Sequence, residues 1–92
     1  MIKSFKHKGL KKLFETGKIS GVNPLHAERL RKILALLETS ETIEDIDLPG
    51  LNLHNLKGKR KTTFAVKVSG NWRVTFKLMN GDILEVNYED YH

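Results

Sequence analysis

The second half of the chain carries residue types suited to general acid–base chemistry on a phosphodiester. Cleavage of RNA through its own 2′-hydroxyl needs a base, cations around the phosphate, and an acid for the departing 5′-oxygen. Histidine titrates near neutrality, arginine grips phosphate oxygens with paired hydrogen bonds, and lysine acts as a point charge. The residues that could supply this chemistry are His54, Lys57, Arg73, Asp90, Tyr91 and His92.

Each of these residues also has an ordinary structural explanation. His54 could be a solvated loop histidine. Arg73 could pair with Glu85 or Glu89 across a sheet, a contact worth about 0.2–1 kcal/mol when exposed. Residues 90–92 could be a frayed tail, as terminal residues often are. Composition and spacing alone therefore do not establish an enzyme.

Other catalytic chemistries find less support. No two histidines have the spacing of helical metal ligands, and there is no cysteine. Asp90 and His92 could be two ligands, but a third is not evident. No serine lies in a nucleophile elbow, and the run 57–59 (Lys-Gly-Lys) lacks the pattern of a phosphate-binding loop. The sequence predicts neither a metal nor a cofactor.

Charge is distributed unevenly along the chain. Residues 1–18 hold six lysines and one glutamate, a net charge of +5, whereas residues 38–47 hold five acids and no base. Residues 57–77 hold seven bases and no acid. A basic stretch set apart from an acidic one suits a protein that binds a polyanion. Charged faces that serve only solubility are the alternative.

Length and composition limit the architecture. A chain of 92 residues makes one domain, residues 1–92, and the absence of cysteine excludes disulfides. No apolar run approaches the roughly 20 residues that span a bilayer, so we expect no membrane partner. The first residues lack the apolar core of a secretory signal, and the expected location is cytoplasmic.

The first half predicts two helices. Leu10, Leu13 and Phe14 follow helical spacing, and Gly17 suits a helix end because it tolerates the left-handed conformation. Asn23 is a candidate cap for the second helix, with Pro24 in its first turn. An apolar stripe then runs from residue 30 to residue 37 at helical spacing.

The second half changes to the period of strands. Apolar residues alternate along 64–68, 72–78 and 84–88, and Asn80-Gly81 is a strong hairpin signal. Residues 2–4 and 53–56 could add short strands. The prediction is an α+β domain with two N-terminal helices packed on one face of a small, mostly antiparallel sheet.

The other face of this sheet is expected to be open and basic. It would carry Lys67, Arg73, Thr75 and Lys77, which together could hold a nucleic-acid strand. A straight last strand, however, would point Asp90 and His92 toward the core, opposite Arg73. Because burying both would be costly, we expect the strand to end, bend or bulge near Glu89, so that the tail is re-aimed.

Four pieces of the sequence, in order, resemble HigB-type toxins of the RelE-like superfamily. They are Met1-Ile2-Lys3-Ser4-Phe5, Leu53-His54-x-Leu56-Lys57-Gly58, Asn71-Trp72-Arg73-Val74-Thr75-Phe76 and Asn87-Tyr88-Glu89-Asp90-Tyr91-His92. The resemblance covers nearly the whole chain. It implies a microbial-ribonuclease-like fold and a toxin that cleaves mRNA in the ribosomal A site without a metal.

The same resemblance assigns roles to residues and names partners. It implies acid–base work for Asp90 or His92, phosphate contacts for Lys57 and Arg73, and an orienting or stacking role for Tyr91, with His54 completing the set. Which group is the base stays open. Residues expected to contact RNA are Lys59, Arg60, Lys67, Asn71 and Lys77, with Asn71 at the position of codon reading. The implied partners are a HigA-like helix-turn-helix antitoxin, the ribosome and mRNA.

One stretch departs from the family pattern. After Lys57-Gly58, relatives tend to carry a glycine, aromatic residues and a serine, whereas residues 59–65 here read Lys-Arg-Lys-Thr-Thr-Phe-Ala. The added charge could alter affinity for the ribosome. Two alternatives stay open: a non-catalytic toxin on the same fold, like the superfamily members that poison DNA gyrase, and an RNA-binding module without activity.

Overall fold

Four antiparallel strands in the order β1-β2-β3-β4 form the centre of the molecule. The computed structural model describes residues 1–60 and 62–91. The strands are β1 (His54–Asn55), β2 (Phe64–Ser69), β3 (Trp72–Met79) and β4 (Asp82–Asp90). The helices are α1 (Lys8–Thr16) and α2 (Ala27–Thr39), with three short 3₁₀ turns, η1 (Pro24–His26), η2 (Ile43–Asp45) and η3 (Gly58–Arg60).

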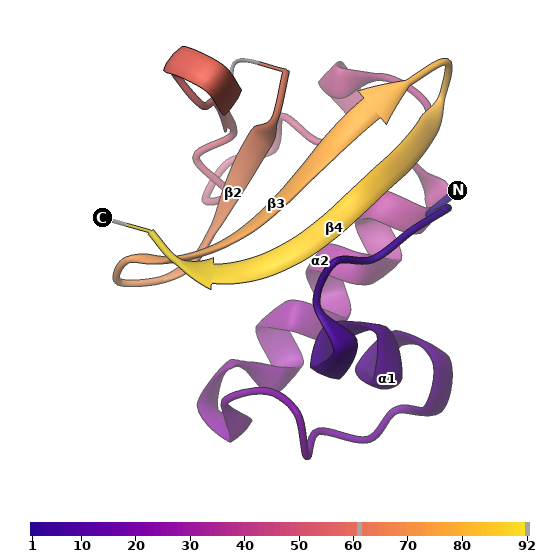
Figure 1. Cartoon of the computed structure of the whole chain (residues 1–92), viewed down its shortest axis with the longest axis vertical. Coiled ribbons are helices and arrows are strands. Elements are labelled where there is room, and N and C mark those ends of the chain that lie inside the picture. Colours follow the sequence, from indigo (N-terminus) through magenta and orange to yellow (C-terminus); the bar gives the residue numbers. More distant parts are fainter. Residues whose placement is uncertain (61, 92) are drawn as a thin grey trace.

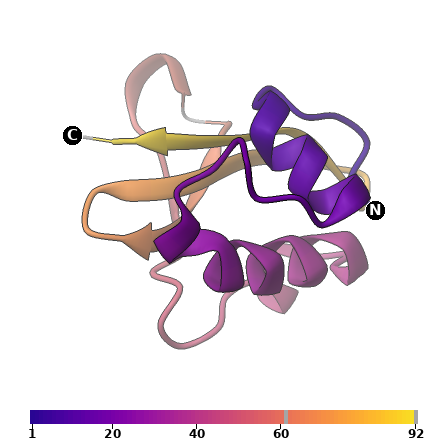
Figure 2. The same ribbon diagram turned by 90° about the horizontal axis from the view of Figure 1, so that it is seen from below.

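The two faces of the sheet have different neighbours. Helix α2 lies across one face, with α1 beside it near the β4 edge (Figure 1). The turn η3 lies on the opposite side of the sheet from α2 (Figure 2). We call these the inner face and the outer face. The predicted α+β class is confirmed, and none of the described helices is long and apolar enough to span a bilayer.

Local signals explain where the helices begin and end. The His7 side chain accepts a hydrogen bond from the Leu10 amide at 3.0 Å and so caps α1, a role the sequence did not reveal. Gly17 ends α1 with a φ of 78°, as predicted. Asn23 caps η1 rather than α2, because its side chain accepts from the Leu25 amide and α2 begins only at Ala27.

The core lies between the inner face and the helices. Every second residue of β2 and β3 points into it, as the alternation predicted. Its fully buried members include Leu10, Leu30, Leu34, Leu37, Val66, Val74, Phe76, Ile83 and Val86. Burying side chains of this size stabilises the fold by roughly 1.5–3 kcal/mol each.

A β-bulge in β4 makes the observed register of this strand differ from the predicted one. Lys77 pairs with Leu84, but Thr75 pairs with Asn87, so β4 holds one extra residue at this point. Glu85 occupies it with a φ of 53°. The extra residue reverses the alternation on its N-terminal side. Ile83, not Leu84, is therefore the buried residue at the start of the strand.

Strand β4 ends at Asp90, one residue after Glu89, which confirms the expected strand end, but the chain neither bends nor bulges there. After the bulge, β4 stays in register with β3 as far as the pair of Trp72 with Asp90. The Tyr91 amide continues the ladder by donating to the Asn71 carbonyl at 2.8 Å. The only bulge in the described residues of β4 occurs four residues before Glu89, at Glu85, where no glycine marks it.

Smaller predictions have mixed outcomes. Asn80 and Gly81 both have positive φ, which confirms the hairpin turn. The possible strand at residues 53–56 is the two-residue β1. Residues 2–4 form no strand, but the segment runs along β4 through isolated parallel bridges of Ile2 with Ile83 and Phe5 with Val86.

Helix α1 and the loop before α2 touch through two glycines. A Cβ placed on Gly9 would lie 2.1 Å from the carbonyl oxygen of Gly21. One placed on Gly21 would lie 2.5 Å from the Gly9 Cα. Because both neighbours are backbone atoms, neither can turn aside as a side chain would. The contact requires glycine at residue 9 for packing, although this residue lies in a helix.

We predict that Gly9→Ala lowers the free energy of unfolding by about 1–3 kcal/mol through overpacking. Helix propensity alone would raise it by up to about 1 kcal/mol. Urea denaturation of both proteins measures the difference. Lys12→Ala on the exposed side of α1 is the control, with an expected change within about 0.5 kcal/mol. A Gly9→Ala protein as stable as the wild type would contradict the contact.

Candidate active site

The outer face of the sheet contains a hollow of about 200 Å³ beneath the segment that includes η3. Its cations come from three separate parts of the chain: the N-terminal segment, the η3 segment and β3. The lining residues are Lys6, Lys59, Arg60, Thr62, Thr63, Thr75, Lys77, Glu85 and Asn87. The covering segment explains why Ala65 and Thr75 are buried although they lie on this face.

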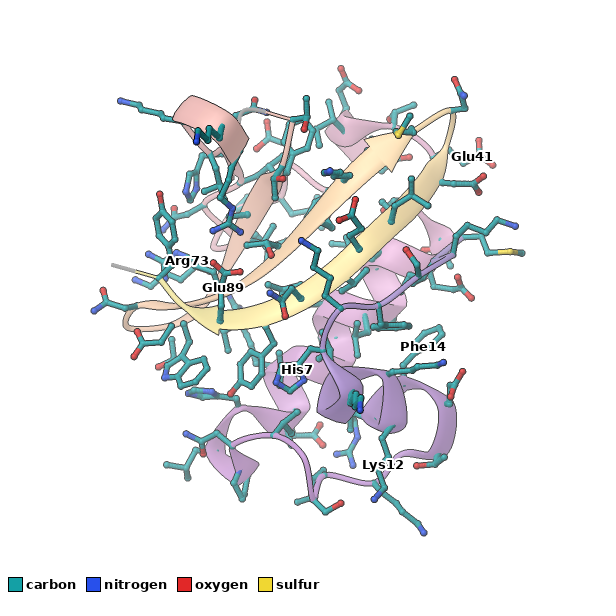
Figure 3. The ribbon with its side chains drawn as sticks, in the orientation of Figure 1. His7, Lys12, Phe14, Glu41, Arg73 and Glu89 are labelled. Atoms are coloured by element: carbon teal, nitrogen blue, oxygen red, sulfur yellow. The ribbon has the colours of Figure 1, made fainter. Side chains whose placement is uncertain are left out.

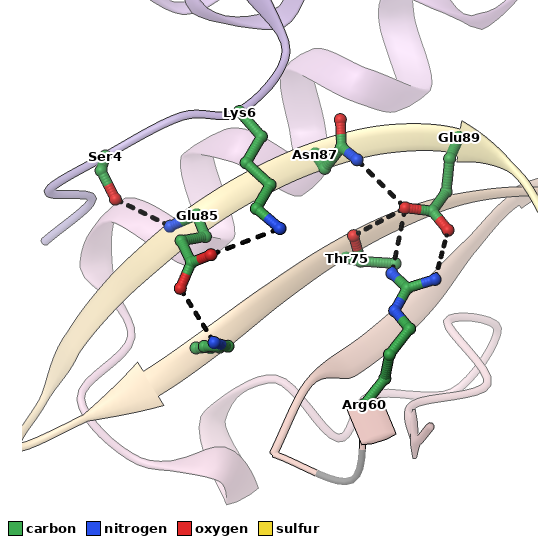
Figure 4. A network of polar contacts seen from close by, with 8 residues as sticks. Ser4, Lys6, Arg60, Thr75, Glu85, Asn87 and Glu89 are labelled. Carbon is green, nitrogen blue, oxygen red and sulfur yellow. Dashed lines mark hydrogen bonds and ion pairs between the residues drawn. The ribbon is translucent and has the colours of Figure 1, made fainter. Parts of the chain in front are cut away.

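Glu89 occupies the centre of a polar network on this face (Figure 4). Its carboxylate accepts two hydrogen bonds from Arg60, at 2.8 and 3.1 Å. It also accepts from the Asn87 amide at 3.1 Å and from the Thr75 hydroxyl at 3.4 Å. The bond from Arg60 is the main reason that the pKa of Glu89 lies below its usual value.

A second carboxylate joins the N-terminal segment to the sheet. Glu85 lies 3.0 Å from the Lys77 ammonium and 3.3 Å from that of Lys6. Its backbone amide donates to the Ser4 hydroxyl at 2.8 Å, so the bulge residue is fixed through both its backbone and its side chain (Figure 4). Its hydrogen bonds with Lys77 and then Lys6 lower the pKa of Glu85.

Arg73 lies on the outer face, next to Lys67 on β2 and Glu89 on β4 (Figure 3). Its guanidinium donates to the carbonyls of Gly70 at 2.7 Å and Trp72 at 3.0 Å. Its Nε is buried and has no hydrogen-bond partner among the described residues. The expected pairing of Arg73 with Glu85 or Glu89 is replaced by bonds to its own turn, because the two glutamates pair with other cations.

The end of the chain is divided between the two faces. Tyr91 follows Glu89 by two residues and so lies on the outer face, where the Arg60 guanidinium carbon is 6.0 Å from its ring centroid. Asp90 pairs with Trp72 and so belongs to the inner-face register, but it is exposed. His92 lies outside the described residues. The structure thus brings Tyr91, but not Asp90, to the face of Arg73.

His54 and Lys57 lie on the β1 side of the sheet, and both are exposed. His54 pairs with Ala65, which pairs with Thr75, so the three share the outer face. The His54 Nδ1 lies 2.8 Å from the Asn52 carbonyl oxygen. A carbonyl only accepts, so Nδ1 carries the hydrogen, and the Nε2 of the neutral ring can accept a proton.

The residues expected to contact RNA divide according to their partners. Arg60 and Lys77 line the hollow, but each is bound to a glutamate. Lys59 also lines it and, like Lys67, forms no ion pair within residues 1–60 and 62–91. Asn71 is exposed in the β2–β3 turn, and its carbonyl receives the Tyr91 amide.

Sequence reasoning did not predict three members of the polar network. They are Lys6, Glu85 as the partner of Lys6 and Lys77, and Glu89 as the partner of Arg60. Residue 6 lies in a different part of the chain, and the bulge at Glu85 has no sequence mark. Glu89 alternates with Tyr88 and so could be placed on the outer face, but its partner in η3 could not. The described residues contain no group of three or more side chains able to hold a metal ion.

Comparisons with known proteins agree with this architecture. Residues 3–92 match the family model described as RelE-like toxin of type II toxin-antitoxin system HigB. The chain belongs to the HigB family of RelE-like toxins. It is 47% identical over 92 residues to Endoribonuclease HigB of Proteus vulgaris, and the match covers all of both chains. Membership of a type II toxin–antitoxin family implies an antitoxin as partner.

We predict that the two carboxylates make the fold sensitive to acid. Their folded pKa values lie below the unfolded value of about 4.3, so the stability they contribute is present above that pH. It is lost as the pH falls through the folded values. The Glu85→Gln, Glu89→Gln double variant should therefore lose less unfolding free energy between about pH 5 and pH 3 than the wild type. Urea denaturation across this range tests it, and parallel curves would be contrary to the prediction.

Proposed function

We propose that this chain is a toxin that cleaves mRNA in the ribosomal A site. Two findings support the proposal. The chain belongs to a toxin family, and a full-length relative with 47% identity is named an endoribonuclease. The observation that carries the chemistry is the outer sheet face, where Arg73, Tyr91 and the cations of the hollow share one surface.

The proposed reaction uses the 2′-hydroxyl of RNA as the nucleophile and needs no metal. A base removes the hydroxyl proton, the oxygen attacks the adjacent phosphorus, and the 5′-oxygen leaves with a proton from an acid, so a cyclic phosphate remains. Nε2 of His54 is a candidate acceptor because Nδ1 already donates to Asn52. Asp90 and His92 are the other candidates for proton transfer. Lys57 and Arg73 offset the charge that gathers on the phosphate.

The proposal extends to partners and location. The antitoxin is of the HigA-like helix-turn-helix kind, and the ribosome presents the message in the cytoplasm. Lys59, Lys67 and Asn71 contact RNA, supported by their exposed or half-exposed positions at the η3 segment, on β2 and in the adjoining turn. Arg60 and Lys77 contribute with part of their charge already paired.

We predict that Asp90→Asn and His92→Ala each slow cleavage on ribosomes about 10²–10⁴-fold, the usual contribution of a general acid or base. Ribosomes programmed with a full set of codons provide the substrate. Growth arrest on induction should weaken in parallel. Thermal unfolding of each variant shows whether the fold is kept.

Asp82→Asn is the matched control, because Asp82 is the same residue type at the opposite end of β4. It should cleave like the wild type. Absence of cleavage by the wild type at every codon would reject the enzyme, and inhibition of DNA supercoiling would then favour the non-catalytic toxin. Equal cleavage of free RNA would reject ribosome dependence.

A further inference from the structure

The Glu89 carboxylate accepts four hydrogen bonds from neighbouring side chains, and this makes it unsuited to act as a base. Its side chain is only 23% exposed, and both oxygens accept hydrogen bonds from Arg60. Oε2 also accepts from Thr75 and Asn87. A base would have to break these bonds to receive a proton. Its lowered pKa also makes Glu89 a weak base near neutrality.

The same contacts make Glu89 the junction of two parts of the proposed site. Arg60 ends η3, which follows Lys57 and contains Lys59. Glu89 lies next to Asp90 and Tyr91 at the end of β4. Arg60 makes two contacts with this end of β4: the paired hydrogen bonds to Glu89 and the cation–π contact with the Tyr91 ring. A paired arginine–carboxylate contact fixes orientation as well as distance.

Among the described residues, Arg60 provides the hydrogen bonds and the ring contact that join the tip of the η3 segment to β4. The Arg60 carbonyl accepts from the Thr63 amide, and the Leu56 amide donates to Thr63, but these bonds lie within the segment itself. Lys59 and Lys57 have no ion-pair partner among the described residues. Lys57 is also anchored by the buried Leu56 before it, so the Arg60–Glu89 pair fixes chiefly the tip of the segment, with Lys59, relative to the end of β4.

We propose that Glu89 is a positioning residue, which holds the tip of the lysine-bearing segment 57–60 at the catalytic end of β4 through Arg60. This inference rests on the proposed function, because it concerns the geometry of that same site. Glu89 touches no RNA in this role. It acts on the reaction only by placing the tip of this segment, with Lys59, relative to Asp90 and Tyr91.

The charge of Glu89 makes the role testable. Glu89→Gln removes a negative charge from a face that binds a polyanion, so electrostatics alone would strengthen RNA binding. A positioning role predicts the opposite effect on rate. We expect kcat on ribosomes to fall about 10–100-fold, as expected when catalytic groups move by about an ångström, without a rise in KM. Arg60→Lys keeps the charge but loses the paired geometry, so it should give the same result.

Glu28→Gln is the matched control. It breaks another arginine–glutamate pair, with Arg31 on α2, where the contact is 2.6 Å and lies outside the proposed site. Its kcat should equal that of the wild type. Glu89→Asp, which restores a carboxylate, should recover part of the lost rate. A Glu89→Gln protein that cleaves as fast as Glu28→Gln would overturn the proposal.

Nuclear magnetic resonance of the Arg60 guanidinium separates this inference from the proposed function. Rotation of the Arg60 side-chain nitrogens should be slow in the wild type and fast in Glu89→Gln. If the wild type cleaves nothing, the proposed function fails, while slow rotation would still support the junction. Fast rotation of the Arg60 side-chain nitrogens in the wild type would overturn the positioning role of Glu89, whatever the cleavage assay shows. Arg60→Lys gives the cleavage result should Glu89→Gln fail to fold.

Discussion

The alternation of side chains along β3 is the constraint on which the rest of the molecule depends. Val74 and Phe76 point toward α2 and are fully buried, whereas Arg73 and Lys77, on either side of this pair, point to the outer face. The apolar set holds the helices, and its burial fixes the register of the sheet, because a slip by one residue would expose it. The polar set is thereby fixed as well. The outer face is positioned by the packing of the inner one.

The bulge at Glu85 reconciles this constraint with the contacts at the N-terminus. An uninterrupted β4 would place Leu84 in the core and turn Ile83 outward. The extra residue instead buries Ile83, which pairs with Ile2 of the N-terminal segment, and leaves the Glu85 carboxylate between Lys6 and Lys77. A positive φ is unfavourable for glutamate. The ion pairs and the bond to Ser4 over-determine the position and hold it there.

Sequence patterns predicted the parts of the fold that depend on neighbours along the chain. Alternation placed Arg73 and Lys77 on one face, and Asn80-Gly81 located the hairpin, because both signals are local. The bulge escaped prediction because Ile83 and Leu84 are both apolar, so either could have filled the core. The Arg60–Glu89 pair escaped because it joins residues 29 positions apart through an irregular segment. The candidate site was thus predicted as a set of residue types on a face, but not as a network.

The ion pairs of the polar network on the outer face reduce the positive charge that is left to bind RNA. Three of the cations that line the hollow, Lys6, Arg60 and Lys77, are offset by glutamates, and Arg73 donates hydrogen bonds to its own turn. Within residues 1–60 and 62–91, the basic stretch retains Lys57, Lys59 and Lys67 without carboxylate partners. Together with Arg73, these lysines allow four phosphate contacts on a single strand and a salt slope of about −3, which corresponds to modest affinity for free RNA. An enzyme of this kind gains from a larger assembly that holds the message in place, and this fits the proposed dependence on the ribosome.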